Sequence, residues 1–188
     1  ADLEREKKVE QIVEENLATW QEKGLVPDMA IEPGSETTRL HRERGWRYWH
    51  QLFNGRQLHI FSVVKSKIVS KETGILLGFA SGLNWNGKLS IWDNSDRGRE
   101  GPKNVFLNQA LNTIFNYGCR SFASCQKFLF PKYPSSRTYG KSLGIEPIPA
   151  KVLGQKCDLL ITDPPYADAV NYEEITEFFI AWLRKNPP

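Results

Sequence analysis

Two consecutive prolines, Pro164 and Pro165, constrain this sequence more than any other feature. Each proline fixes its φ angle at about −65° and lacks a backbone N–H, so Asp163–Tyr166 can continue neither a helix nor an interior strand. The apolar run at residues 157–162 precedes them and is short and bounded by breakers of regular structure. Such a run is typical of a buried strand, although a buried helix segment fits it too. The sequence therefore predicts a stiff loop that follows a strand.

A helix is expected shortly after this loop. Asn171 and Glu174 have the spacing of a capping box at its start. Apolar residues recur around and after them at nearly helical spacing: Val170, Ile175, Phe178, Phe179, Trp182 and Leu183. Strand, rigid loop and helix in this order indicate an α/β unit. Ligands of open α/β sheets bind at the carboxyl ends of the strands, where this loop would lie.

The loop residues suit methyl transfer to an exocyclic amino group. The lone pair of an aromatic amine is delocalised into its ring, so the nitrogen needs hydrogen-bond acceptors directed at its protons and a fixed approach to the methyl donor. The carboxylate of Asp163 provides one acceptor, and a backbone carbonyl of the Pro-Pro unit, that of Pro164, provides a second. Tyr166 offers a flat face for a stacked base, a contact worth about 1–3 kcal/mol. A Pro-Pro turn with a tyrosine in the core is the structural alternative.

The tetrapeptide Asp-Pro-Pro-Tyr resembles the catalytic loop of the S-adenosylmethionine-dependent amino-methyltransferases that modify adenine N6 or cytosine N4 in DNA. The longer segment at residues 162–185 is similar to large bacterial and archaeal adenine-specific DNA methylases, which carry an extra N-terminal domain of unknown function and are often associated with anti-phage defence. The resemblance implies that Asp163, Pro164, Pro165 and Tyr166 are catalytic, with S-adenosylmethionine as cofactor and DNA as partner.

A donor site is missing from this sequence. Amino-methyltransferases need a glycine-rich loop for S-adenosylmethionine, and no Phe-x-Gly-x-Gly sequence occurs here. The glycines at residues 74–82 recur every four residues, which predicts a buried helix rather than such a loop. In the family that the chain resembles, the cofactor loop precedes the catalytic loop. We therefore expect a fragment that is inactive alone, binds S-adenosylmethionine weakly or not at all, and is completed by the remaining part of a methyltransferase domain.

The expected fold is an α-rich α/β fold, in which a helical region is attached to a partial Rossmann-like methyltransferase unit. Residues 1–44 are predicted as an N-terminal helix, ended by Gly24, and a linker. Residues 45–118 are predicted as a basic helical region with possible DNA-binding function. Residues 119–188 are predicted as an irregular segment followed by the strand, the Asp-Pro-Pro-Tyr loop and the helix.

Within the helical region, the sequence predicts one capped helix and one aromatic corner. Asn54 and Gln57 have capping-box spacing at the start of a helix. Leu58, Phe61, Val64 and Ile68 continue that helix on one face and leave Lys65, Lys67 and Lys71 on more exposed faces. Either Trp46 or Trp49 is expected to anchor a corner of the core, because aromatic side chains dominate core burial.

Basic residues concentrate in the middle of the chain. The formal net charge is only +3, but residues 39–71 and 97–141 are rich in Lys and Arg with one acid each, whereas acids gather at residues 4–15 and 158–177. This polarity suits contact with phosphates and predicts an affinity that falls with salt. Solvated helix faces explain any single charge equally well.

Five further residues are candidates for substrate binding. Asn171 and Tyr172 follow the loop by about one helical turn. Arg56, Lys103 and Arg137 are basic residues placed to contact nucleic acid. Residues that bind the cofactor are not identifiable.

Other classes of protein fit the sequence less well. The three cysteines lack Cys-x-x-Cys spacing and the three histidines are widely spaced, so no metal site is expected and a cytoplasmic location is favoured. No signal peptide or membrane span is expected, and the oligomeric state is not predicted. The alternative functions are a nucleic-acid-binding or scaffolding module without its own catalysis, and methyl transfer to RNA or to a protein amide.

Overall fold

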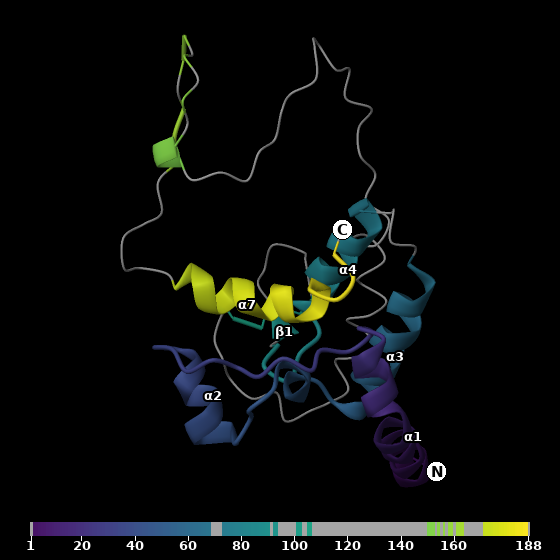
Figure 1. Cartoon of the computed structure of the whole chain (residues 1–188). Coiled ribbons are helices and arrows are strands. Elements are labelled where there is room, and N and C mark those ends of the chain that lie inside the picture. Colours follow the sequence, from purple (N-terminus) through teal and green to yellow (C-terminus); the bar gives the residue numbers. More distant parts are fainter. Residues whose placement is uncertain are drawn as a thin grey trace. The chain divides into compact units, whose positions relative to one another are not determined.

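A computed structural model describes residues 2–68, 73–90, 92–93, 101–102, 105–106, 150–152, 154, 156, 158–159, 161–163 and 171–187. The chain forms two compact units, residues 1–131 with 171–188, and residues 132–170. The described helices of the first unit are α1 (Asp2–Glu22), α2 (Thr37–Arg44), the 3-10 helix η1 (Trp49–Leu52), α3 (Gly55–Lys67), α4 (Thr73–Leu83) and α7 (Tyr172–Leu183) (Figure 1). The described part is therefore rich in helix.

Strand is scarce in the described residues of the first unit. β1 (Trp92–Asp93) pairs antiparallel with β2 (Gly101–Pro102), and each strand has two residues. An isolated bridge joins Ala30 to Tyr48. None of the described helices is long and apolar enough to cross a membrane. The helices therefore supply most of the described core of this unit.

Helix α1 ends as the sequence predicts. Gly24 follows it with φ of 69°, a left-handed conformation that glycine adopts without strain. A Cβ atom at Gly24 would also lie only 2.6 Å from Cβ of Lys185. Glycine is therefore required here both for the backbone conformation and for the close approach of the chain after α7.

Helices α3 and α4 confirm the patterns from which they were predicted. The Asn54 side chain accepts a hydrogen bond from the Gln57 N–H (2.9 Å), and the Gln57 side chain accepts one from the Asn54 N–H (2.9 Å), which completes the predicted capping box. The glycine-containing segment at residues 74–82 lies within α4, where Leu76, Phe79 and Leu83 are buried.

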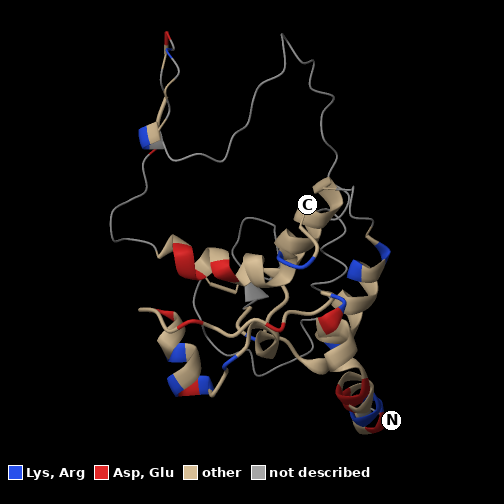
Figure 2. Cartoon of the chain, viewed as in Figure 1, with Lys and Arg blue, Asp and Glu red and all other residues tan. Residues whose placement is uncertain are grey.

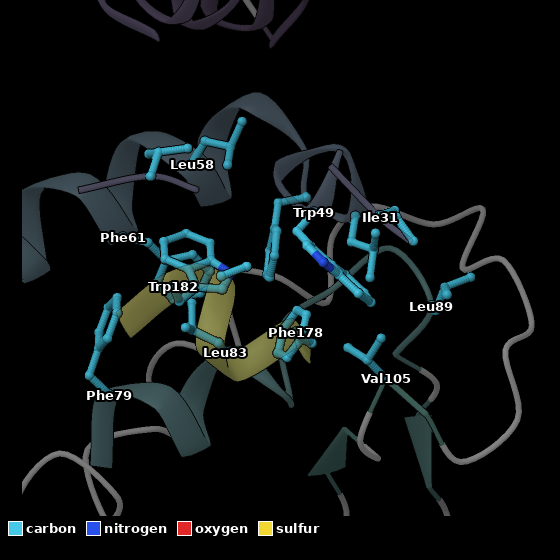
Figure 3. Close-up of a cluster of buried hydrophobic side chains, with 14 of the residues drawn as sticks. Ile31, Trp49, Leu58, Phe61, Phe79, Leu83, Leu89, Val105, Phe178 and Trp182 are labelled. Carbon is cyan, nitrogen blue, oxygen red and sulfur yellow. The ribbon is translucent and has the colours of Figure 1, made fainter. Parts of the chain in front are cut away.

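Helix α7 supplies the centre of an aromatic core (Figure 3). Trp182 and Phe178 are 1% and 0% exposed. The ring of Trp182 packs edge-on against Phe53, with 5.3 Å between centroids, and against Phe61, at 5.9 Å. Such edge-to-face pairs add about 0.5–1.5 kcal/mol each to the burial of apolar area. Trp49 is fully buried and contacts Phe178 edge-on at 5.8 Å, which confirms the predicted aromatic corner.

The segment between α1 and η1 is more ordered than the sequence predicted. Residues 25–44 were expected to form a loop or linker, and this prediction is wrong at α2. Val26, Ile31 and Leu40 from this segment are buried in the core. Helix α2 has only eight residues and one buried apolar side chain, Leu40, so it shows no apolar periodicity. Short elements of this kind depend on tertiary contacts rather than on local patterning.

The described residues of the second unit do not form the predicted buried strand. Leu159 and Ile161 are 74% and 84% exposed, and the described residues around them belong to no strand. The 3-10 helix η2 (Ala150–Val152) is the element described in this unit. A strand needs neighbours to satisfy its backbone hydrogen bonds, and the described residues of this unit offer none. The predicted strand is therefore wrong at these residues.

Candidate functional site

Asp163 is the one residue of the predicted catalytic loop that the structure describes. It belongs to the second unit, and its side chain is exposed. Pro164, Pro165 and Tyr166 lie outside the described residues, as do Lys103 and Arg137. An exposed carboxylate can accept hydrogen bonds from an incoming amino group without first breaking a buried contact.

Asn171 and Tyr172 lie at the start of α7, in the first unit. Asn171 is the N-cap residue, but its side chain makes no capping hydrogen bond, so the predicted capping box with Glu174 is wrong. The Asn171 Nδ2 atom instead donates to the hydroxyl of Ser35 (2.7 Å). Tyr172 is 47% exposed and is accessible for stacking. The predicted position of the helix itself is confirmed.

Glu174 caps a different helix from the one in which it lies. Its carboxylate accepts hydrogen bonds from the backbone N–H of Thr37 (2.7 Å) and of Glu36 (3.0 Å), and from the Ser35 hydroxyl (2.9 Å). These groups lie at the N-terminus of α2, where the helix dipole favours a negative charge. Gly34 leaves room for this contact, since a Cβ there would lie 2.4 Å from the carboxylate carbon of Glu174. The contact joins α7 to a segment far away in the sequence.

The pKa of Glu174 reflects these contacts. Burial raises the pKa of the carboxyl, but the hydrogen bonds from Thr37, Ser35 and Glu36 outweigh burial and lower it below the ordinary value of 4.5. A carboxyl whose pKa is lower in the folded state stabilises the fold above its unfolded pKa. This contribution is lost as the pH falls through the folded pKa.

Replacing this carboxylate should loosen α2. We expect Glu174→Ala to lower the free energy of unfolding by about 1 kcal/mol at neutral pH, as is typical for loss of a helix cap. The loss should shrink at acidic pH, as the pH falls through the lowered folded-state pKa of the wild-type carboxyl. Chemical denaturation at neutral and at acidic pH measures this. Glu173→Ala, an exposed acid in the same turn, should change little; equal effects of the two substitutions would contradict the capping role.

Arg56 lies in a different part of the first unit from Asn171. It is in the first turn of α3 and forms an ion pair with Glu6 of α1. With residues from both helices it lines a pocket. Asn171 contacts Ser35, before α2, so the structure does not bring these two predicted substrate-binding residues together. The other residues of the pocket were not predicted, although Arg5, Lys8 and Ile12 have the helical spacing that would have indicated one face.

Lys65 is the most perturbed titratable group in the described part of the chain. It was predicted on an exposed face of its helix, and this is wrong: the residue is 4% exposed. Its ammonium donates hydrogen bonds to the backbone carbonyl of Gly24 (2.6 Å) and to that of Trp182. Burial lowers the pKa of Lys65 to about 8. Lys65 thus satisfies carbonyls at the C-terminal ends of α1 and α7, a structural role.

The lowered pKa of Lys65 predicts an unusual dependence of stability on pH. Between about pH 8 and 10.5 the folded state binds fewer protons than the unfolded state, so stability should rise with pH in this window. Relative to Lys65→Met, the free energy of unfolding of the wild type should rise by about 1–3 kcal/mol from pH 7.5 to 10. Denaturant titrations over this range test it. Lys67→Met, at an exposed position, should keep the wild-type dependence of the unfolding free energy on pH. If the difference in unfolding free energy between wild type and Lys65→Met did not change with pH, this would contradict the burial of the charge.

Exposed positive charge gathers on α2 and the residues that follow it (Figure 2). Arg42, Arg44 and Arg47 are exposed. Arg39 is partly neutralised by Glu43, with 3.5 Å between the charged atoms. Arg42 also pairs with Glu43, with 3.2 Å between the charged atoms. Exposed pairs of this kind contribute only about 0–1 kcal/mol to stability.

No family model, curated protein or solved structure matches this chain. The likeness of residues 162–185 to adenine-specific DNA methylases therefore stays a prediction from the sequence. Among the described residues, no cluster of three or more His, Cys, Asp or Glu side chains has an arrangement that could hold a metal ion.

Proposed function

We propose that this chain supplies the acceptor-binding side of an S-adenosylmethionine-dependent methyltransferase that acts on the N6 amino group of adenine in DNA. The sequence Asp163-Pro164-Pro165-Tyr166 carries this proposal, and the exposure of the Asp163 carboxylate supports it. Asp163 accepts a hydrogen bond from one amino proton, and the carbonyl of Pro164 accepts one from the other. Tyr166 stacks on the base, which must leave the duplex to reach these groups.

The methyl donor is assigned to another part of the methyltransferase domain. When bound, S-adenosylmethionine supplies an electrophilic methyl group. The glycine-containing segment at residues 74–82 does not fit the loop that would hold it, because these residues lie in helix α4. The proposed role of this chain is therefore confined to holding the acceptor nitrogen and orienting its lone pair.

DNA is the proposed acceptor because of the distribution of charge. The arginines of α2 and the residues after it are exposed, and phosphates bind such groups with an affinity that falls with salt. Asn171 and Tyr172 remain candidates for contact with the substrate, since Tyr172 is exposed. RNA carries the same phosphates and amino groups, so methyl transfer to RNA is a variant of the same proposal.

A second candidate is a nucleic-acid-binding or scaffolding module without catalysis of its own. The helix-rich first unit favours it, because the described residues there form a core to which α7 belongs, with basic side chains on its surface. Such a module would bind duplex DNA in a salt-dependent manner and methylate nothing.

Mass analysis of nucleosides tests the proposal. The natural protein that carries this sequence is incubated with DNA, RNA or a peptide mixture and with S-adenosylmethionine bearing a deuterated methyl group. N6-methyladenine with the heavy methyl group in DNA is the expected product. Heavy methyl groups found only in RNA or only in peptides would show that RNA or protein, rather than DNA, is the acceptor. Salt-dependent DNA binding with no heavy product in any sample would support the second candidate instead.

A further inference from the structure

The segment at residues 44–48 combines basic and aromatic side chains on the surface of the first unit. Its sequence is Arg-Gly-Trp-Arg-Tyr, and it begins at the last residue of helix α2. Arg44 and Arg47 are exposed, and neither forms an ion pair with any residue that the structure describes. Arginine forks match the oxygen atoms of phosphate groups particularly well. Both guanidinium groups are therefore open to an anionic partner.

The acids closest to this segment in the chain are already paired with other groups. Glu43 pairs with Arg39 at 3.5 Å and with Arg42 at 3.2 Å. Glu174 contacts the opposite, N-terminal end of α2. Residues 36–48 contain four arginines and two glutamates in all. Positive charge therefore remains in excess here, and it lies on the two arginines that have no ion pair.

Tyr48 offers a flat aromatic ring beside these charges. The residue is 43% exposed and follows Arg47 directly in the chain. Its ring stacks on that of His50, with 5.7 Å between the centroids and 25° between the planes. The His50 ring is in turn held by Gln21, whose Nε2 atom lies 3.3 Å from Nδ1 of His50. The Tyr48 ring is therefore supported by its neighbour and still accessible, as stacking of a base requires.

The backbone of the segment is fixed by contacts with the rest of the first unit. The Ile31 N–H donates a hydrogen bond to the carbonyl of Arg47 (2.9 Å). Tyr48 pairs with Ala30 in the isolated bridge. Trp46 is half-buried and packs against the core. A surface that is ordered before its partner arrives loses less conformational entropy on binding.

We propose that residues 44–48 bind single-stranded nucleic acid, with one base stacked on Tyr48 and with phosphates on Arg44 and Arg47. Aromatic platforms next to cations that follow the backbone are the general means of holding unpaired strands. The bases of a duplex stack on one another and do not reach such a ring. The inference rests on the nucleic-acid partner of the proposed function, and it uses none of the residues assigned to methyl transfer.

Fluorescence anisotropy with the full chain tests this inference. The probes are a short labelled oligothymidylate and its duplex with oligodeoxyadenylate, and polyglutamate serves as a competitor that carries charge without bases. At low salt we expect the single strand to bind about tenfold more tightly than the duplex, and polyglutamate to compete poorly. Equal binding of the duplex, or competition by polyglutamate as strong as that by unlabelled single strand, would show that charge alone is recognised and would overturn the proposal.

Substitutions separate the stacked base from the phosphates. Tyr48→Ala should weaken binding of the single strand about tenfold, whereas Tyr48→Phe, which keeps the ring, should stay within about twofold of the wild type. Arg47→Gln should reduce the slope of log affinity against log salt concentration by about 0.7, the value for one phosphate of a single strand, and Tyr48→Ala should leave that slope unchanged.

Lys67→Gln is the control, since Lys67 is an exposed cation of α3 outside the segment; its affinity should stay within about twofold of the wild type. Circular dichroism checks that the variants remain folded. Equal affinities of Tyr48→Ala and Tyr48→Phe for the single strand would contradict the stacking role of Tyr48.

The outcome is distinguishable from that of the methyl-transfer test. Binding that depends on Tyr48, with no heavy methyl group in any nucleoside, would support this surface and contradict the methyltransferase. Heavy N6-methyladenine from a protein whose binding of the single strand does not depend on Tyr48 would contradict this surface alone.

Discussion

Asp163→Ala is expected to reduce methyl transfer to adenine by about a hundredfold or more, by analogy with the loss of one directed hydrogen bond in other active sites. In the proposed arrangement this carboxylate accepts a hydrogen bond from the amino group and so directs the nitrogen lone pair toward the methyl donor. The side chain is exposed, so its removal should leave the free energy of unfolding almost unchanged. Rates of heavy-methyl incorporation into DNA by the natural protein measure the effect.

The matched control is Asp158→Ala. Asp158 is also exposed and lies in the same unit, five residues before Asp163. The substitution Asp158→Ala removes the same charge and leaves the predicted acceptor, Asp163, in place. We expect Asp158→Ala to keep the wild-type rate within about twofold, as for most surface substitutions. Wild-type methylation by Asp163→Ala, or an equal loss in both variants, would contradict the role of Asp163.

Trp182→Ala should lower the free energy of unfolding by about 3–5 kcal/mol, because large-to-small substitutions of buried aromatic residues lose both apolar contact and packing. Trp182 is 1% exposed and its ring contacts those of Phe53, Phe61 and Phe79. These rings come from segments that lie far before α7 in the sequence. A loss of this size is a large part of the stability of an ordinary domain.

Ile180→Ala provides the comparison on the same helix. Ile180 is 48% exposed, so the substitution should cost about 1 kcal/mol or less. Denaturant unfolding followed by circular dichroism measures both variants against the wild type. If Trp182→Ala lowered the free energy of unfolding no more than Ile180→Ala does, α7 would not belong to the core of the first unit.

Local features of the fold could be predicted from the sequence. The end of α1 at Gly24 and the cap of α3 by Asn54 follow from residue types at fixed spacing, because both depend on hydrogen bonds within a few residues. The helix at residues 73–83 follows from the spacing of its glycines and apolar residues. Each of these signals is contained within a single element.

Long-range contacts could not be predicted in the same way. Helix α2 is stabilised by Glu174, more than a hundred positions later in the chain, and no local pattern indicates such a partner. Lys65 is buried because carbonyls at the ends of two other helices converge on its ammonium. In the sequence, it looks like any other lysine on a helix face. Both errors have one cause: the partner group lies on another element.

For the candidate site, the sequence predicts which chemical groups are present but not the structure around them. The types and order of residues 163–166 indicate acceptors for an amino group, and Asp163 is accessible in the structure. The apolar run before it suggested a buried strand, but hydrophobicity alone cannot supply the neighbouring strands that a sheet requires. Leu159 and Ile161 are instead exposed.

Recognition of the adenine amino group is the central claim, and one binding measurement tests it most directly. The full chain is titrated with a single-stranded oligothymidylate that carries one adenine, and with the same strand in which unsubstituted purine replaces the adenine. Purine stacks similarly but lacks the amino group that Asp163 and Pro164 are proposed to hold. We predict that the wild type prefers the adenine strand by about fivefold and that Asp163→Ala, which keeps only the Pro164 carbonyl as acceptor, shows a smaller preference. Equal affinity of the wild type for the two strands would contradict the claim.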